Sequence, residues 1–109
     1  MRFKDLGPRE VHAQLGRYAT IVDVRQPDEL LGDLGYIEGA VNIPLGLVPN
    51  EAHTLDRTKP VLVVCRSGGR SAAGANHLAM LGFEDVTNLE GGMLAWAQLR
   101  LPVARRVAS

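Results

Sequence analysis

Short apolar runs alternate along this chain with segments in which apolar residues recur at every third or fourth position. The apolar runs predict four strands, over residues 20–24, 40–43, 60–65 and 86–89. The helical spacing predicts a helix that begins at Pro8, a short one over residues 28–31, and two longer ones over residues 71–81 and 92–99. Residues 45–59 show neither pattern, and we expect a loop there with one helical turn near Glu51.

The clearest strand is the run from Pro60 to Cys65, PVLVVC. Its unbroken apolar character is typical of a parallel strand that is covered on both faces. Because strands alternate with helices, we expect an α/β fold, a small parallel sheet with helices on both faces and right-handed crossovers. Ligands bind at the carboxyl ends of the strands in such folds. Cys65 lies at that end of the most buried strand and is therefore the first candidate for a functional residue.

A chain of 109 residues fits one compact domain. We expect this domain to span residues 1–103 and the basic residues 104–109 to form a loose tail. Lys and Arg together number 12, as do Asp and Glu, so bulk charge does not favour binding to nucleic acid or to an anionic membrane. The N-terminus lacks the apolar core of a signal peptide, and no apolar run is long enough to span a bilayer. We therefore expect a cytoplasmic protein.

Cys65 is the only cysteine in the chain. It has no partner for an intramolecular disulfide and no cysteine partners for a structural zinc site, and we expect no bound metal. An isolated cysteine at the end of a strand is usually a small, inert core residue. The residues that follow Cys65 favour the other interpretation, in which the thiol is reactive.

The segment from Cys65 to Ser71, CRSGGRS, runs from the strand through a tight Gly-rich turn into the next helix. Small residues in succession allow several backbone N–H groups to point inward, which makes an anion-binding nest. The following helix directs its positive end at the same point, and two arginines add permanent positive charge. The residues that we expect to bind an anionic substrate are therefore Arg66, Ser67, Gly68, Gly69, Arg70 and Ser71.

Such surroundings favour the thiolate of Cys65 over its thiol. A free cysteine has a pKa of about 8.5, and lowering it by about two pH units requires about 2.7 kcal/mol of preferential anion stabilisation. A helix dipole contributes about 0.3–1 kcal/mol, whereas a hydrogen bond to a charged group contributes about 1.5–3 kcal/mol. Two hydrogen bonds to the sulfur would therefore suffice, and the loop amides should matter more than the helix.

Two other cysteine chemistries fit the spacing less well. A Cys–His pair would need a histidine at the loop, but His77 falls on the far side of the following helix, and His12 and His53 lie in unrelated segments. We expect all three on the surface. A cysteine phosphatase uses a C-x5-R loop that leaves room for a phosphoryl group, whereas Cys65 and Arg70 form the shorter C-x4-R. The shorter loop favours a persulfide sulfur over phosphate.

Four ordered segments resemble the rhodanese family, and together they cover almost the whole chain. They are the D-x-R element in residues 21–25, the G-A-x-N-I-P segment at residues 39–44, the active loop that begins at Cys65, and the C-terminal G-F and L-x-G-G-x-x-x-W patterns at residues 82–83 and 89–96. The family commonly has G-H-I where this chain has Gly35-Tyr36-Ile37. Tyr36 can still pack and donate one hydrogen bond, so we expect little change, and no role of that histidine is transferred to this chain.

The resemblance implies a rhodanese-like fold and a sulfurtransferase of the thiosulfate sulfurtransferase type. Cys65 would attack the outer sulfur of thiosulfate or another donor and keep that sulfur as a persulfide until cyanide or a thiol removes it. Arg66 and Arg70 would orient the anionic donor, whereas Asp23 and Arg25 would support the loop from behind. The resemblance implies no cofactor. The implied partners are a small anionic donor, a thiol or cyanide acceptor, and a sulfur-relay protein.

Other functions stay open on the sequence alone. A carrier that accepts a persulfide from one protein and passes it to another would have the same loop. A cysteine phosphatase or arsenate reductase is disfavoured by the short loop, and an inactive interaction module is disfavoured because inactive relatives typically lack the cysteine. Turnover with thiosulfate and cyanide, compared with protein donors, would separate the enzyme from the carrier.

Overall fold

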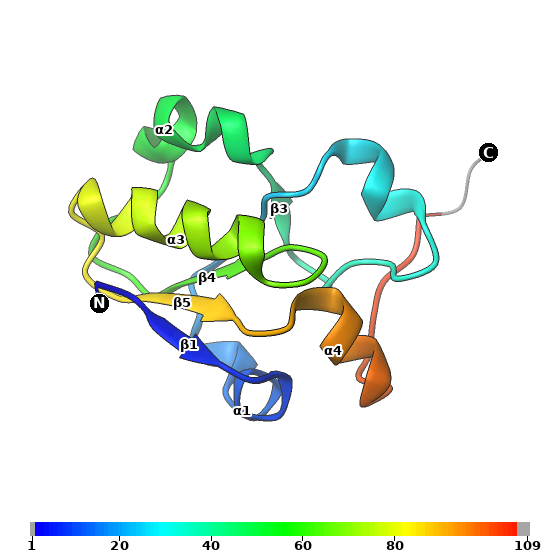
Figure 1. The fold of residues 1–109 in the computed structure, drawn as a ribbon. Coiled ribbons are helices and arrows are strands. Elements are labelled where there is room, and N and C mark those ends of the chain that lie inside the picture. Colours follow the sequence, from blue (N-terminus) through cyan, green and yellow to red (C-terminus); the bar gives the residue numbers. More distant parts are fainter. Residues whose placement is uncertain (1, 107–109) are drawn as a thin grey trace.

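The computed structural model describes residues 2–106. Five parallel strands form one sheet in the order β1-β5-β4-β2-β3 (Figure 1). The central strand is β4 (Val61–Val64), which directly precedes Cys65 and lies between β5 (Val86–Leu89) and β2 (Thr20–Asp23). The edges are β1 (Lys4–Leu6) and β3 (Val41–Asn42). The expected α/β fold with a parallel sheet is confirmed.

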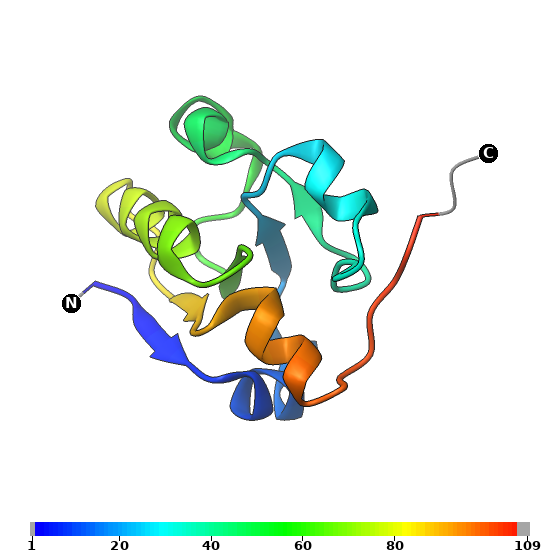
Figure 2. The ribbon, with the colours of Figure 1, turned by 45° about the vertical axis from the view of Figure 1, so that its right-hand side comes forward.

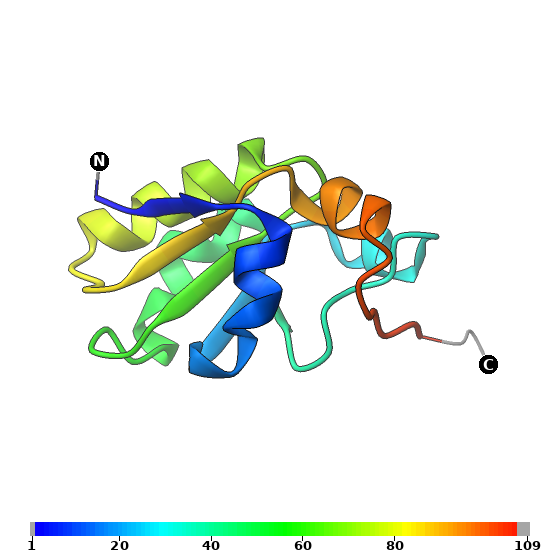
Figure 3. The same cartoon turned by 90° about the horizontal axis from the view of Figure 1, so that it is seen from below.

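Helices cover both faces of the sheet (Figure 2, Figure 3). On one face lie α2 (Val48–Glu51) and α3 (Gly69–Met80), and on the other lie α1 (Pro8–Ala13) and α4 (Gly92–Gln98). The short 3-10 helices of the described chain connect these elements; they are η1 (Leu15–Arg17), η2 (Pro27–Leu31), η3 (Leu45–Leu47) and η4 (Ala52–Thr54). None of the helices within residues 2–106 is long and apolar enough to cross a bilayer.

Side chains alternate along β4 and so divide the core into two clusters. Val61, Val63 and Cys65 belong to the cluster that includes α3, whereas Leu62 and Val64 belong to the cluster that includes α4. Successive side chains of a strand point to opposite faces of the sheet, which gives this period of two. The side chain of Cys65 therefore leaves the strand on the face that α3 covers, below the loop that leads into this helix.

Two segments form more regular structure than the sequence analysis predicts. The N-terminal strand β1 was not predicted, because its polar sequence KDL pairs with β5 on one side only and buries little. The helical turn predicted near Glu51 is confirmed by α2, but the loop predicted around it is wrong over the rest of residues 45–54, where η3 and η4 flank α2 directly. Val48 and Ala52 are the buried residues of this segment, and their spacing of four was the weak helical signal.

The start of α3 also differs from the prediction. The helix begins at Gly69 rather than near Ser71, because Gly68 adopts a φ of +103° and turns the chain abruptly. Glycine is a poor helix former on average, so the sequence pattern placed the start too late. The active loop is therefore shorter than predicted, and the N–H groups of Gly69, Arg70 and Ser71 lie in the first helical turn, where they have no partner inside the helix.

The chain beyond the expected domain boundary at residue 103 packs against the loop around Tyr36. Ala104 and Tyr36 exchange two backbone hydrogen bonds, of 2.8 and 3.0 Å. Arg105 donates a hydrogen bond to the carbonyl of Asp33, and the guanidinium of Arg106 lies 5.4 Å from the centre of the Tyr36 ring. The predicted tail is therefore attached to the domain at residues 104–106, and its residues 107–109 lie outside the described part.

Candidate active site

Cys65 follows β4 at the carboxyl end of the central strand and is only 1% exposed. Its Sγ accepts a hydrogen bond from the backbone N–H of Gly68 over 3.0 Å. Arg66, Ser67 and Gly69, from the same loop, are exposed to solvent. The sulfur thus lies beneath an exposed loop, with a backbone donor directed at it.

Gly68 holds this loop in a conformation that glycine adopts readily and other residues rarely adopt. A Cβ atom at this position would lie 3.0 Å from the backbone nitrogen of Gly91, which has little room to move. The carbonyl oxygen of Gly68 accepts hydrogen bonds from the Ser71 hydroxyl, at 3.2 Å, and from the Asn88 side-chain amide, at 3.4 Å. These contacts fix the residue whose N–H faces Cys65.

Asn88 was not identified by the sequence analysis. It is buried near the end of β5, and its Nδ2 donates to the carboxylate of Asp5 at 2.8 Å as well as to Gly68. Its Oδ1 is buried and has no hydrogen-bond partner among the described residues. The signal was an amide within the buried strand sequence VTNL, because burying a polar side chain costs free energy unless hydrogen bonds offset it.

The surroundings of Cys65 lower the pKa of its thiol below the ordinary value. Burial is the largest single effect and raises the pKa. Hydrogen bonds from the hydroxyl and amide of Ser71, and from the amides of Gly68 and Ser67, together outweigh it. The Ser71 hydroxyl has one hydrogen and two acceptors within reach, the carbonyl oxygen of Gly68 and the sulfur, so it can turn to the sulfur when the thiol ionises.

The start of α4 holds the loop from its other side. The N–H of Met93 donates to the carbonyl of Cys65 at 2.9 Å, and the N–H of Leu94 donates to the carbonyl of Arg66 at 3.0 Å. The first N–H groups of a helix have no partner within it, so they are available for this contact. At Gly92, a Cβ atom would lie 2.5 Å from the carbonyl group of Arg66. This close approach explains why α4 begins with a glycine.

Arg70 is bound to an acidic residue instead of pointing freely toward the thiol. Its guanidinium makes two hydrogen bonds, of 2.7 and 2.8 Å, to the carboxylate of Glu29 in η2. These bonds are the main reason why the pKa of Glu29 is lowered to about 2. The positive charge expected from Arg70 is therefore largely neutralised, whereas Arg66 forms no salt bridge within residues 2–106.

Asp23 and Arg25 form an ion pair that is almost completely buried. Arg25 donates from Nε and Nη2 to the two carboxylate oxygens, at 2.9 and 2.7 Å, and from Nη2 to the carbonyl of Gly35 at 2.8 Å. The side chain of Asn42 donates to the backbone carbonyls of both charged residues. The pair thus links the end of β2 to β3 and to the loop at Gly35, an arrangement suited to the supporting role expected for it.

The three histidines are exposed, as predicted, and lie on separate elements. His12 is on α1, His53 is on η4 and His77 is on the outer side of α3. None of them makes a hydrogen bond to the sulfur of Cys65. The site therefore has no histidine placed to act as a base.

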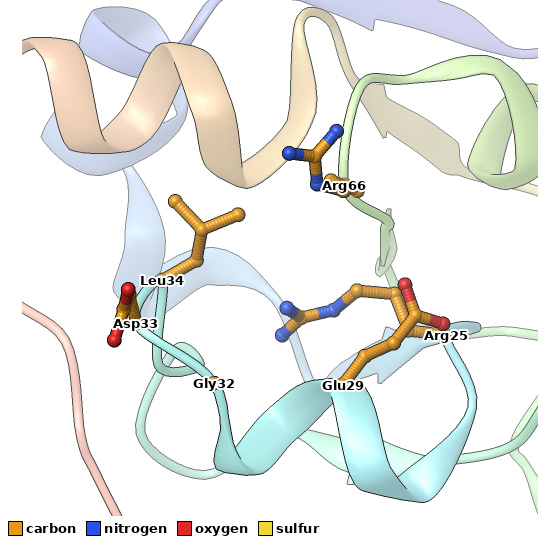
Figure 4. Close-up of a pocket in the computed structure, with 6 residues that line it drawn as sticks. All are labelled: Arg25, Glu29, Gly32, Asp33, Leu34 and Arg66. Atoms are coloured by element: carbon orange, nitrogen blue, oxygen red, sulfur yellow. The ribbon is translucent and has the colours of Figure 1, made fainter.

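A pocket of about 250 Å³ opens beside the active loop (Figure 4). Arg66 lines one side of the pocket and directly follows Cys65 in the chain, so this side lies close to the thiol. The residues that line the pocket come from the end of β2, from η2 and the turn after it, and from the loop; they are Arg25, Glu29, Gly32, Asp33, Leu34 and Arg66.

Comparisons with known proteins agree with this geometry. The model of the rhodanese-like domain family matches residues 7–99. The chain belongs to the rhodanese family. A sulfurtransferase of Allochromatium vinosum is 36% identical over 83 residues, which are 76% of this chain and 76% of that protein. The thiosulfate sulfurtransferase GlpE of Stutzerimonas stutzeri is 32% identical over 94 residues, which are 86% of this chain and 84% of that protein.

A solved structure carries the same fold. The crystal structure of a rhodanese-related protein from Thermoplasma volcanium has a TM-score of 0.86 to this chain at 32% identity. The similarity covers 95% of this chain and 100% of that one. Family and relatives together support a rhodanese-type sulfur-transfer role and a transferase activity for this chain.

Proposed function

We propose that this protein is a sulfurtransferase that moves sulfane sulfur from thiosulfate or a persulfide donor to a thiol or cyanide through a persulfide on Cys65. One observation carries the proposal: the N–H of Gly68 donates to the sulfur at 3.0 Å, within a loop that lowers the pKa of the thiol. A thiolate is the form that attacks a sulfur–sulfur bond.

The reaction has two steps, each a displacement at sulfur. The Cys65 thiolate attacks the outer sulfur of thiosulfate, so a bond forms between the two sulfurs and the bond to the sulfonate group breaks. Sulfite leaves with the electron pair, and the persulfide keeps the negative charge. An acceptor thiolate or cyanide then attacks the outer sulfur, and Cys65 leaves as a thiolate. Neither step needs a cofactor, an oxidant or a histidine base.

The loop residues have distinct parts in this scheme. The amides of Ser67, Gly68 and Ser71 stabilise negative charge on the Cys65 sulfur and then on the outer sulfur of the persulfide. Arg66, which has no salt bridge within residues 2–106, orients the anionic donor. Arg70, paired with Glu29, acts mainly by fixing the first turn of α3. Asp23 and Arg25 support the loop, and a reducing compartment such as the cytoplasm would keep Cys65 ready for reaction.

Intact mass spectrometry after incubation with thiosulfate tests the proposal. We expect a gain of one sulfur atom, about 32 Da, that is lost on treatment with cyanide or dithiothreitol and absent in Cys65→Ser. Hydrolysis of p-nitrophenyl phosphate without any sulfur adduct would instead support the phosphatase alternative and overturn the proposal.

The sulfur-carrier alternative shares the Cys65 persulfide and differs in turnover. An enzyme is expected to release sulfite and thiocyanate over many cycles from thiosulfate and cyanide. A carrier would load from a protein persulfide and discharge to a protein acceptor, with negligible turnover of the small molecules. Steady-state assays with both kinds of donor separate the two functions.

A further inference from the structure

The pocket beside the active loop contains hydrogen-bond donors that the fold itself leaves unused. Arg25 is only 1% exposed, and its Nε and Nη2 face Asp23 and the carbonyl of Gly35. Nη1 makes no hydrogen bond to the described residues, and it is not one of the fully buried unpaired side-chain atoms, so part of its surface stays accessible. Because Arg25 lines the pocket, Nη1 is free to donate to a molecule inside it (Figure 4).

Arg66 is the lining residue to which an anion would bind in this pocket. Arg66 lines the pocket from the active loop and has no salt bridge within residues 2–106. Both oxygens of Glu29 accept hydrogen bonds from Arg70, so the negative charge of this lining residue is already compensated. Asp33 is exposed and also lines the pocket. The uncompensated charges are thus those of Arg66 and of Asp33.

The size of the pocket exceeds what the sulfur donor requires. A water molecule occupies about 30 Å³ in the liquid, so a pocket of about 250 Å³ has room for about eight groups of that size. Leu34 adds an apolar surface on another side of the pocket from the two arginines, which suits methylene groups (Figure 4). These features fit a short chain that carries an anionic head.

We propose that this pocket binds the carboxylate of a small thiol acceptor, with Arg66 and Nη1 of Arg25 as donors and Leu34 against the methylene chain. The proposal rests on the sulfurtransferase function and specifies its acceptor. Arg25 would then bind substrate in addition to supporting the loop. Because Arg66 is the neighbour of Cys65, an acceptor held there would have its thiol beside the persulfide.

The test separates the two half-reactions. The persulfide is first formed with thiosulfate, the excess donor is removed, and discharge is followed with 3-mercaptopropionate and with its neutral amide. We expect Arg66→Met to reduce the rate constant for the carboxylate about tenfold, as loss of one charge-assisted hydrogen bond predicts, and to change that for the amide little. Asp33→Asn is the matched control, because it removes the opposite charge from the same pocket and should not weaken carboxylate binding.

Two results would overturn the inference. One is an equal loss for the acid and the amide in Arg66→Met. The other is slower loading from thiosulfate with unchanged discharge, which would assign the pocket to the sulfonate of the donor. Arg25→Lys keeps the pair with Asp23 but lacks Nη1, and it should show the same selective loss if its melting temperature shows that it is folded.

A binding measurement separates failure of this inference from failure of the proposed function. Butyrate carries the carboxylate and methylene chain but no thiol, so its binding requires no sulfur chemistry. We expect butyrate to shift the NMR signals of the Leu34 methyl groups in the wild type and to shift them much less in Arg66→Met. Butyrate binding without any persulfide would retain the pocket and reject the sulfurtransferase. Persulfide formation without butyrate binding would retain the sulfurtransferase and reject the carboxylate pocket.

Discussion

The side-chain amide of Asn88 donates a hydrogen bond to the carbonyl of Gly68, the residue whose N–H donates to the sulfur of Cys65. Asn88 in β5 is therefore connected to the thiol through one glycine. A second hydrogen bond, to Asp5, holds the amide in this orientation. The edge strand β1 thus contributes to the active loop although it lies two strands away from β4.

Replacement of Asn88 by Ala should raise the pKa of Cys65, because the carbonyl of Gly68 loses one of the three hydrogen bonds that fix it and keeps those from Ser71 and Ala72. We expect the second-order rate constant with thiosulfate at neutral pH to fall about threefold to tenfold, the range for one hydrogen bond. Thiolate absorbance at 240 nm, followed against pH, measures the change. Thr87→Val is the control, since Thr87 is equally buried and its hydroxyl has no partner in the described structure. An unchanged titration in Asn88→Ala would rule out this connection.

Ser71 should set the pH dependence of the reaction. The pKa of Cys65 is lowered in the folded protein, so the rate of alkylation by iodoacetamide should rise as pH rises through that pKa and level off below the pH at which a free cysteine does. Ser71→Ala removes one of the groups that lower the pKa and should shift the curve to higher pH. A curve that coincides with that of free cysteine would contradict the lowered pKa.

The size of a reagent should limit its access to the thiol of Cys65. Cys65 is 1% exposed, and the loop residues that follow it are small apart from Arg66 and Arg70. Iodoacetamide should therefore modify the folded protein much faster than a bulky maleimide does, relative to the rates of the two reagents with the unfolded chain in urea. Equal ratios for the two reagents would indicate that the loop opens widely in solution.

The sequence predicted the parts of this site that depend on local pattern. The apolar run before Cys65 identified the central strand, and the small residues after it identified the turn with inward-facing amides. Side-chain alternation and glycine conformation depend on a few consecutive residues, so the sequence pattern alone predicts them. This is why the position of Cys65 followed from the pattern alone.

The supporting contacts were not predictable in the same way. Glu29 meets Arg70 across 41 residues, and Asn88 meets Gly68 across 20 residues. Both pairs form because η2, the end of β5 and the start of α3 come together at the carboxyl ends of the strands. A local sequence pattern does not show which polar residues will be neighbours in the folded chain. The same holds for β1, whose polar residues become a strand only by pairing with β5.

Glu29 should make stability depend on pH in the acid range. Its pKa is lowered from 4.5 to about 2 in the folded protein, chiefly by Arg70. The stabilisation is therefore fully present above the unfolded-state value and is lost as pH falls from about 4.5 toward about 2. Urea denaturation should show Glu29→Gln less stable than wild type at pH 7, with the difference vanishing toward about pH 2. Asp28→Asn, an exposed neighbour in η2, should show no such convergence.

Gly92 should be the glycine at which substitution disturbs both stability and the site. It adopts a φ of +59°, and a Cβ atom would lie 2.5 Å from the carbonyl carbon and oxygen of Arg66. Gly92→Ala should lower the free energy of unfolding by about 2 kcal/mol or more, the sum of backbone strain and overpacking. Gly16→Ala is the control, because a Cβ atom there meets nothing within 4 Å.

The same substitution should also reach the chemistry, because Gly92 begins the helix whose Met93 and Leu94 N–H groups hold the backbone of the active loop. If α4 moves away from Arg66, those two hydrogen bonds lengthen and the carbonyl of Cys65 loses its fixed position. We therefore expect Gly92→Ala to raise the pKa of Cys65 and to slow persulfide formation at temperatures at which the variant is still folded. A variant that loses stability but keeps the wild-type thiolate titration would show that α4 supports the fold alone.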